Sequence, residues 1–254
     1  TMKKFRVLVV VAALVMALAS VSVAFAQKPA YETGVITSIT FQNVTDQEAS
    51  LTVDIYKSSG TPFATKALVV PANSGNSLYL GDLVTGDLAG SAVLSSDKEI
   101  VATAVQIPQS TTVKNRALSN GFKAGTSEVL LATVLKNQFN TTSQFAIQNA
   151  GTNNTDIEVK FYEVGNTTPV ATITETGIAP GVSKYFDAGK LSEVPNPFNG
   201  SATVTASSGS IVGSVIEAQT NGNAIYAFEG VNSGAPTVFM ATALCDAFGG
   251  ANTA

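Results

Sequence analysis

Residues 39–56 read ITFQNVTDQEASLTVDIY, and most of this pattern returns at residues 145–162 as FAIQNAGTNNTDIEVKFY. The tripeptide FQN at 41–43 is answered by IQN at 147–149, and VDIY at 53–56 by VKFY at 159–162, both at a spacing of 106. A fixed period of this length indicates a duplicated domain rather than a short solenoid repeat.

The similarity between the two copies continues downstream. Matching pairs are Pro71 with Pro180, Gly90-Ser91-Ala92 with Gly200-Ser201-Ala202, Ile100-Val101 with Ile211-Val212, Gly121 with Gly230, and Gly125 with Gly234. The stretch VLLATVLKNQF at 129–139 also matches VFMATALCDAF at 238–248. The spacing drifts between 106 and 111 across these pairs, as expected if insertions fall in loops. The sequence therefore predicts two copies of one fold.

The N-terminal residues have the pattern of a secretory signal peptide. Basic residues at positions 3, 4 and 6 precede an apolar run at 7–18, and Ala24-Phe25-Ala26 has the small-x-small pattern of a cleavage site. We assign residues 1–26 to this signal and expect cleavage after Ala26. A membrane anchor, the alternative, would need about 20 apolar residues to span the bilayer. The expected location is secreted, either extracellular or at the cell surface, with no membrane association after cleavage.

The part that follows the signal is acidic. Removal of residues 1–26 takes away three of the 14 Lys and Arg and none of the 18 Asp and Glu, so the formal charge falls from -4 to -7. Binding to nucleic acid or to an anionic membrane would work against this field, so neither is expected as a partner.

The mature chain has the hydrophobic pattern of β-strands. Apolar residues alternate with polar ones, as at Leu51, Val53 and Ile55, and helical spacing rarely persists beyond one turn. Expected strands in the first copy are 36–41, 51–55, 64–70, 77–80, 91–94, 99–107 and 128–135; those in the second are 143–148, 157–162, 170–174, 183–186, 202–205, 211–218 and 237–244. Short strands parted by Gly, Asn, Ser and Pro predict two tandem antiparallel β-sandwiches of about seven strands each.

One ambiguity concerns the strand from Glu128 to Leu135, which either closes the first sandwich or opens the second. We favour the first arrangement, with repeats at 27–139 and 140–254 and a short, stiff junction around 137–141, because it leaves no strand over. In the other arrangement the first sandwich lacks a strand, and the matching segment from Thr237 to Leu244 has no partner. An unpaired strand and an open edge favour insertion between molecules. Self-association through the edge strand from Thr237 to Leu244 is therefore an alternative.

Several longer motifs resemble the tandem Ig-like β-sandwich repeats of secreted bacterial cell-surface proteins. They are VLLATVLKNQFNTTSQFAIQNAG, VKFYEVG, IAPGVSKYF, PFNGSATV and IVGSVIEA, and the resemblance covers essentially the whole chain after the signal. It implies spacer or adhesive modules, with other surface proteins or polysaccharide as partners, and it brings no catalytic residue and no cofactor.

Composition excludes the usual catalytic sites. The chain has no histidine, so Ser-His-Asp and Cys-His nucleophilic sites are impossible. Paired carboxylates are the one catalytic option, because glycoside hydrolysis needs only two of them. Candidates are Asp54, Asp82, Asp87, Asp97, Glu99, Glu158, Glu163, Asp187, Glu193 and Glu217. We interpret these as solvated surface residues and expect no enzymatic activity.

Three further features suggest candidate sites. Asp82 and Asp87 lie in the loop GDLVTGD and are a calcium-site hypothesis, although hard cations prefer six to eight oxygen ligands. Tyr79 and Tyr185 are candidate glycan-contact aromatics in a chain without tryptophan. Cys245, the only cysteine, cannot form an intramolecular disulfide and leaves open a pairing between chains.

The function predicted from the sequence is a non-enzymatic structural or adhesive module at the cell surface. The alternatives are a carbohydrate-binding module and a fibre subunit assembled by strand donation.

Overall fold

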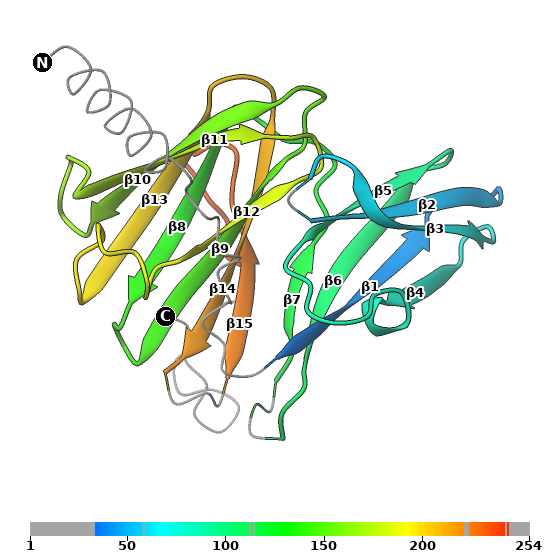
Figure 1. Cartoon of the computed structure of the whole chain (residues 1–254), viewed down its shortest axis with the longest axis horizontal. Coiled ribbons are helices and arrows are strands. Elements are labelled where there is room, and N and C mark those ends of the chain that lie inside the picture. Colours follow the sequence, from blue (N-terminus) through cyan, green and yellow to red (C-terminus); the bar gives the residue numbers. More distant parts are fainter. Residues whose placement is uncertain are drawn as a thin grey trace, which may run out of the picture.

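The computed structural model describes residues 34–57, 59–111, 113, 115–220, 224–241 and 243, and it shows an all-β protein (Figure 1). The expected signal peptide and Cys245 lie outside the described residues. Four antiparallel sheets form two sandwiches, which we call the first sandwich (β1–β7) and the second sandwich (β8–β15). The prediction of tandem β-sandwiches is confirmed.

The first sandwich contains a four-stranded and a three-stranded sheet, with strand orders β4-β1-β6-β7 and β3-β2-β5. Its strands are β1 (Val35–Asn43), β2 (Ala49–Tyr56), β3 (Pro62–Val70), β4 (Gly75–Tyr79), β5 (Ser91–Ser96), β6 (Ile100–Pro108) and β7 (Ala117–Asn120). A short 3-10 helix, η1 (Leu80–Asp82), follows β4. In β2 buried residues alternate with exposed or half-buried ones, as the period-two pattern of the sequence predicts.

The second sandwich contains two four-stranded sheets, ordered β11-β10-β13-β8 and β12-β9-β14-β15. Its strands are β8 (Glu128–Lys136), β9 (Thr141–Asn149), β10 (Thr155–Glu163), β11 (Ala171–Ile178), β12 (Ser183–Asp187), β13 (Phe198–Ala206), β14 (Ile211–Gln219) and β15 (Ile225–Glu229). Strands β9 to β15 follow the same path between the two sheets as β1 to β7 do. The shared topology explains why the sequence match extends over most of the chain.

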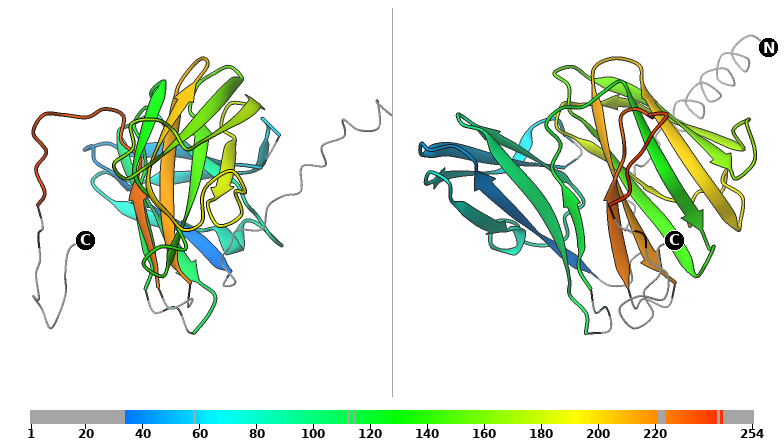
Figure 2. Two further views of the ribbon diagram at one scale, coloured as in Figure 1. Left: turned by 90° about the vertical axis from the view of Figure 1, so that its left-hand side faces the viewer. Right: turned by 180° about the vertical axis from the view of Figure 1, so that it is seen from behind.

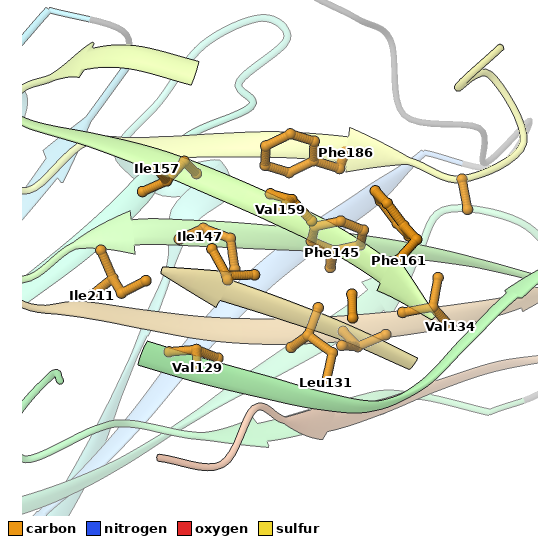
Figure 3. Close-up of a cluster of buried hydrophobic side chains, with 14 of the residues drawn as sticks. Val129, Leu131, Val134, Phe145, Ile147, Ile157, Val159, Phe161, Phe186 and Ile211 are labelled. Atoms are coloured by element: carbon orange, nitrogen blue, oxygen red, sulfur yellow. The ribbon is translucent and has the colours of Figure 1, made fainter. Parts of the chain in front are cut away.

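Strand β8 belongs to the second sandwich, and the expectation that it closes the first is wrong. It pairs antiparallel with β13, with Val204 opposite Val129 and Ala202 opposite Leu131. Figure 3 shows Val129, Leu131 and Val134 of β8 among the buried residues of this sandwich. The boundary between the two units therefore lies in the 121–127 connection, before β8 instead of after it.

The two sandwiches have separate hydrophobic cores. The first surrounds Phe41, Leu51 and Val53, whereas the larger second core contains stacked Phe145 and Phe186 rings, with centroids 4.8 Å apart. Separate cores of this kind are what duplication of one domain predicts.

A small third cluster joins the units where β7 lies beside β15 (Figure 1). It contains Val113, Ala117 and Ile225, and the backbone N–H of Ile225 donates to the side-chain oxygen of Asn115 at 3.0 Å. The expected junction at 137–141 is instead the turn between β8 and β9, in which Asn137, Phe139 and Asn140 have positive φ. Contact between the units is thus made by strand edges and not by that turn.

Candidate functional site

The first sandwich lacks the strand that β8 supplies to the second. Strand β13 lies between β10 and β8, whereas its counterpart β5 pairs with β2 on one side and with no strand of the described residues on the other. The registers of the two sheets agree: Ala92 faces Ile55 as Ala202 faces Phe161. The open edge of β5 therefore corresponds to the position that β8 occupies in the second sandwich.

The missing strand leaves core positions of the first sandwich partly open to solvent. Ala202, Val204 and Ile211 are buried in the second sandwich. Their repeat counterparts Ala92, Leu94 and Ile100 are only half-buried. Apolar residues at matching positions differ in burial because one sandwich has the covering strand and the other does not.

Glycines next to the strand position show the same contrast. In the second sandwich Gly230 is buried, and a Cβ built on it would lie 2.5 Å from Cγ1 of Val129 and 2.9 Å from Cδ2 of Leu131. The counterpart Gly121 is exposed, and the three atoms nearest to a Cβ there all belong to Ala102, the closest at 3.3 Å. The closer contacts that β8 side chains would make with a Cβ at Gly230 thus have no equivalent at Gly121.

The C-terminal segment repeats the sequence of β8, but its described residues pair with no strand. We predicted a strand from Thr237 to Leu244; the described residues of that segment, 237–241 and 243, form none, so this prediction is wrong for them. Val238, Phe239 and Met240 are 69%, 91% and 73% exposed. Figure 2 shows the chain after β15, coloured red, leading away from both sandwiches. Three consecutive large apolar side chains are thus in solvent.

One end of the open β5 edge is covered by the second sandwich. The Tyr185 hydroxyl donates to the carbonyl of Gly90, and Nε2 of Gln148 donates to the carbonyl of Ala92 at 3.3 Å. Ser91 Oγ also donates to the carbonyl of Gly181, at 2.5 Å. Burial of the Tyr185 hydroxyl raises its pKa to about 12, against the opposing effect of its bond to Gly90. These contacts orient the two sandwiches and leave the Leu94 end of the edge open.

The two candidate glycan aromatics are not brought together. Tyr79 ends β4 of the first sandwich and its ring packs on Gly81. Tyr185 lies in β12 of the second sandwich, with its hydroxyl engaged at the junction. The structure therefore assigns Tyr185 a contact between the sandwiches and gives no common aromatic platform for a sugar.

The calcium hypothesis at Asp82 and Asp87 gains no further ligand. Both side chains are exposed, Asp82 in η1 and Asp87 in the following loop. Across the described residues, no group of three or more Asp, Glu, His or Cys side chains converges to hold a metal ion. This loop carries no proposal.

Several of the candidate carboxylates have structural partners. Asp54 accepts from Thr65 at 2.6 Å, and Asp187 lies 3.3 Å from Lys190. Burial raises the pKa of Glu217, although a hydrogen bond from Ser143 opposes the shift. The interpretation of all these residues as solvated surface was therefore too simple: Asp187 is buried and Glu217 half-buried.

No family model, curated protein or solved structure matches this chain. No helix among the described residues is long and apolar enough to cross a membrane. The internal repeat is consequently the comparison that carries the functional argument. The sequence did contain the signal for the open edge, because the match between 129–139 and 238–248 implies one strand more than two closed sandwiches need.

Proposed function

We infer that this protein is a non-enzymatic structural subunit that assembles head to tail by strand donation. Two observations together support this inference: the open edge of β5, and a C-terminal segment that repeats the sequence of β8. Among the described residues, β5 has a neighbour, β2, on one side only, and residues 238–248 repeat the sequence of the strand that fills the other side in the second sandwich. Strand addition to an exposed sheet edge is an established mode of recognition, in which main-chain hydrogen bonds give affinity and alternate side chains give specificity.

Hydrophobic burial favours such an assembly. Val238 and Met240 are largely exposed, and burial of each would contribute about 1.5–3 kcal/mol. The half-buried Ala92, Leu94 and Ile100 would lose water contact at the same time. A strand added at the Leu94 end of β5 would also pair backbone groups that an open sheet edge presents to solvent.

Export and a location at the cell surface complete the proposal and rest on the N-terminal sequence pattern. An exported polymer of stiff sandwiches would serve as structural or adhesive material, which agrees with the function predicted from the sequence. A carbohydrate-binding role receives less support, because Tyr79 and Tyr185 lie in different sandwiches.

The test compares the chain from residue 27 with a variant that lacks residues 237–254. Native mass spectrometry and size-exclusion chromatography over a wide concentration range should show a series of oligomers for the longer chain and a monomer for the shorter one. Circular dichroism should show a folded, β-rich spectrum for both. A longer chain that stays monomeric at every concentration would refute the proposed function.

A further inference from the structure

The acceptor site for the donated strand can be located to the residue. We propose that residues 237–243 of one copy add antiparallel to β5 of a second copy, in the register that β8 adopts on β13. This inference rests on the proposed function and adds to it the edge, the direction and the paired residues.

The register follows from the repeat. In the second sandwich Val204 faces Val129, Thr203 faces Leu130 and Ala202 faces Leu131. The match of Gly90-Ser91-Ala92 with Gly200-Ser201-Ala202 aligns the sequence of β5 with that of β13. The match of VLLA with VFMA aligns residues 129–132 with residues 238–241. The resulting pairs between two copies are Leu94 with Val238, Val93 with Phe239, and Ala92 with Met240. The last pair requires the Gln148 side chain to release the carbonyl of Ala92.

In this register two of the donated side chains would face the first core. Val129 and Leu131 are 1% and 0% exposed in the second core, so Val238 and Met240 would enter the first core. The acceptor is lined by Leu94 and Ala102 where the second sandwich has the smaller Val204 and Gly213. Methionine, which is unbranched and flexible, adapts to an altered space more readily than leucine does.

The outward-facing residue of the donated strand also has a counterpart. Leu130 of β8 forms a bridge with Val231, the residue after Gly230. The equivalent pair between copies is Phe239 with Phe122, the residue after Gly121. Phe239 is 91% exposed and Phe122 36% exposed, so this contact would cover two rings that now face solvent.

One matched pair of variants tests the donated face. Met240→Asp places a charge at the counterpart of Leu131, which is buried, whereas Ala241→Asp places the same charge at the counterpart of Ala132, which is exposed. Both positions are exposed in the monomer, so neither change should affect its folding. We expect Met240→Asp to weaken assembly at least 100-fold and Ala241→Asp to leave it within about threefold. Equal effects would overturn the proposed orientation.

Engineered cysteines test the register. In a Cys245→Ser background, Val93→Cys with Phe239→Cys places two thiols directly opposite each other, within the Cα separation that a disulfide requires. Ser95→Cys with Phe239→Cys moves one thiol two residues along the same face. Mild oxidation should give a ladder of covalent oligomers with the first pair and at most a trace with the second.

The other outcomes separate this inference from the proposed function. Native oligomers without the ladder would overturn the register and leave assembly intact. Absence of both oligomers and ladder would overturn the two together. A disulfide within a monomer would show that the segment completes its own first sandwich, which overturns assembly between copies.

Discussion

Asn43 and Asn149 make the same hydrogen bonds at the same corner of the two sandwiches. Nδ2 of Asn43 donates to the carbonyls of Gln47 and Val70, at 2.6 and 3.2 Å. Nδ2 of Asn149 donates to the carbonyls of Asn153 and Ile178, both at 2.8 Å. Each side chain is buried, at 0% and 1% exposure. The repeated QN dipeptide therefore encodes an amide that ties the end of one strand to the neighbouring hairpin.

Replacement of either asparagine by alanine should destabilise its own sandwich. The change leaves buried backbone carbonyls without donors, which costs about 1–3 kcal/mol. Denaturant unfolding of Asn149→Ala should show a lower midpoint for the second sandwich, and Asn43→Ala for the first. Asn153→Ala is the control, because the side chain at 153 is exposed and only its backbone carbonyl takes part in the bond to Asn149. An unchanged midpoint in Asn149→Ala would contradict this role.

Gly90 and Gly200 should tolerate no side chain. A Cβ on Gly200 would lie 2.0 Å from the carbonyl oxygen of Tyr162, and one on Gly90 would lie 2.1 Å from that of Tyr56. Relief of such contacts requires movement of a backbone strand, so Gly200→Ala should cost about 1–3 kcal/mol, as overpacking does. Thermal unfolding measures the loss. Gly34→Ala, where a Cβ meets no atom within 4 Å, should leave the melting temperature unchanged.

Glu217→Gln should stabilise the protein at neutral pH. Burial raises the pKa of Glu217, so the folded state binds its proton more tightly than the unfolded chain does. The stabilising effect of the protonated form is present below the unfolded pKa and is lost as pH rises through the folded pKa. Glutamine mimics the neutral form at every pH. Unfolding free energies of both proteins should differ at pH 7 and converge in acid; a difference that is constant with pH would contradict the assignment.

Tyr185 should ionise later than an ordinary tyrosine. Its pKa is raised to about 12, so its contribution to stability is present below about pH 10, the ordinary tyrosine value, and is lost as pH rises toward 12. Ultraviolet titration of the phenolate, taken as the difference between the native chain and Tyr185→Phe, isolates this group. A difference curve with a midpoint near 10 would mean that the hydroxyl is not buried at the junction.

The sequence predicted the duplication and most strands because their residues carry local signals: alternating burial, turn residues and the repeated QN, FY and GSA motifs. It missed β7 (Ala117–Asn120) and β15 (Ile225–Glu229), which are short and are held in place by long-range pairing with β6 and β14. It also placed β8 in the wrong sandwich. The repeat pattern allows β8 either to close the first sandwich or to open the second, and only its long-range pairing with β13 decides between these arrangements.

The candidate site could be predicted only in part. The spare strand at 237–244 follows from counting repeats in the sequence, which is why self-association through it is an alternative prediction. The open edge of β5 could not be located, because half-burial of Ala92 and Leu94 depends on a neighbour that is absent from their sheet. Likewise, the role of Tyr185 at the junction depends on the close approach of two separately folded units.

The position of β8 has a consequence for any filament built in the proposed way. Within one chain, β8 leaves the first unit and completes the second; between chains, the C-terminal segment would do the same for the next copy. The junction between two sandwiches of one chain and the junction between two chains would thus be equivalent, although only the first is crossed by the covalent backbone. Such a filament would be polar, with a donor at one tip and a vacancy at the other, and its axial period would approach the height of one sandwich instead of two.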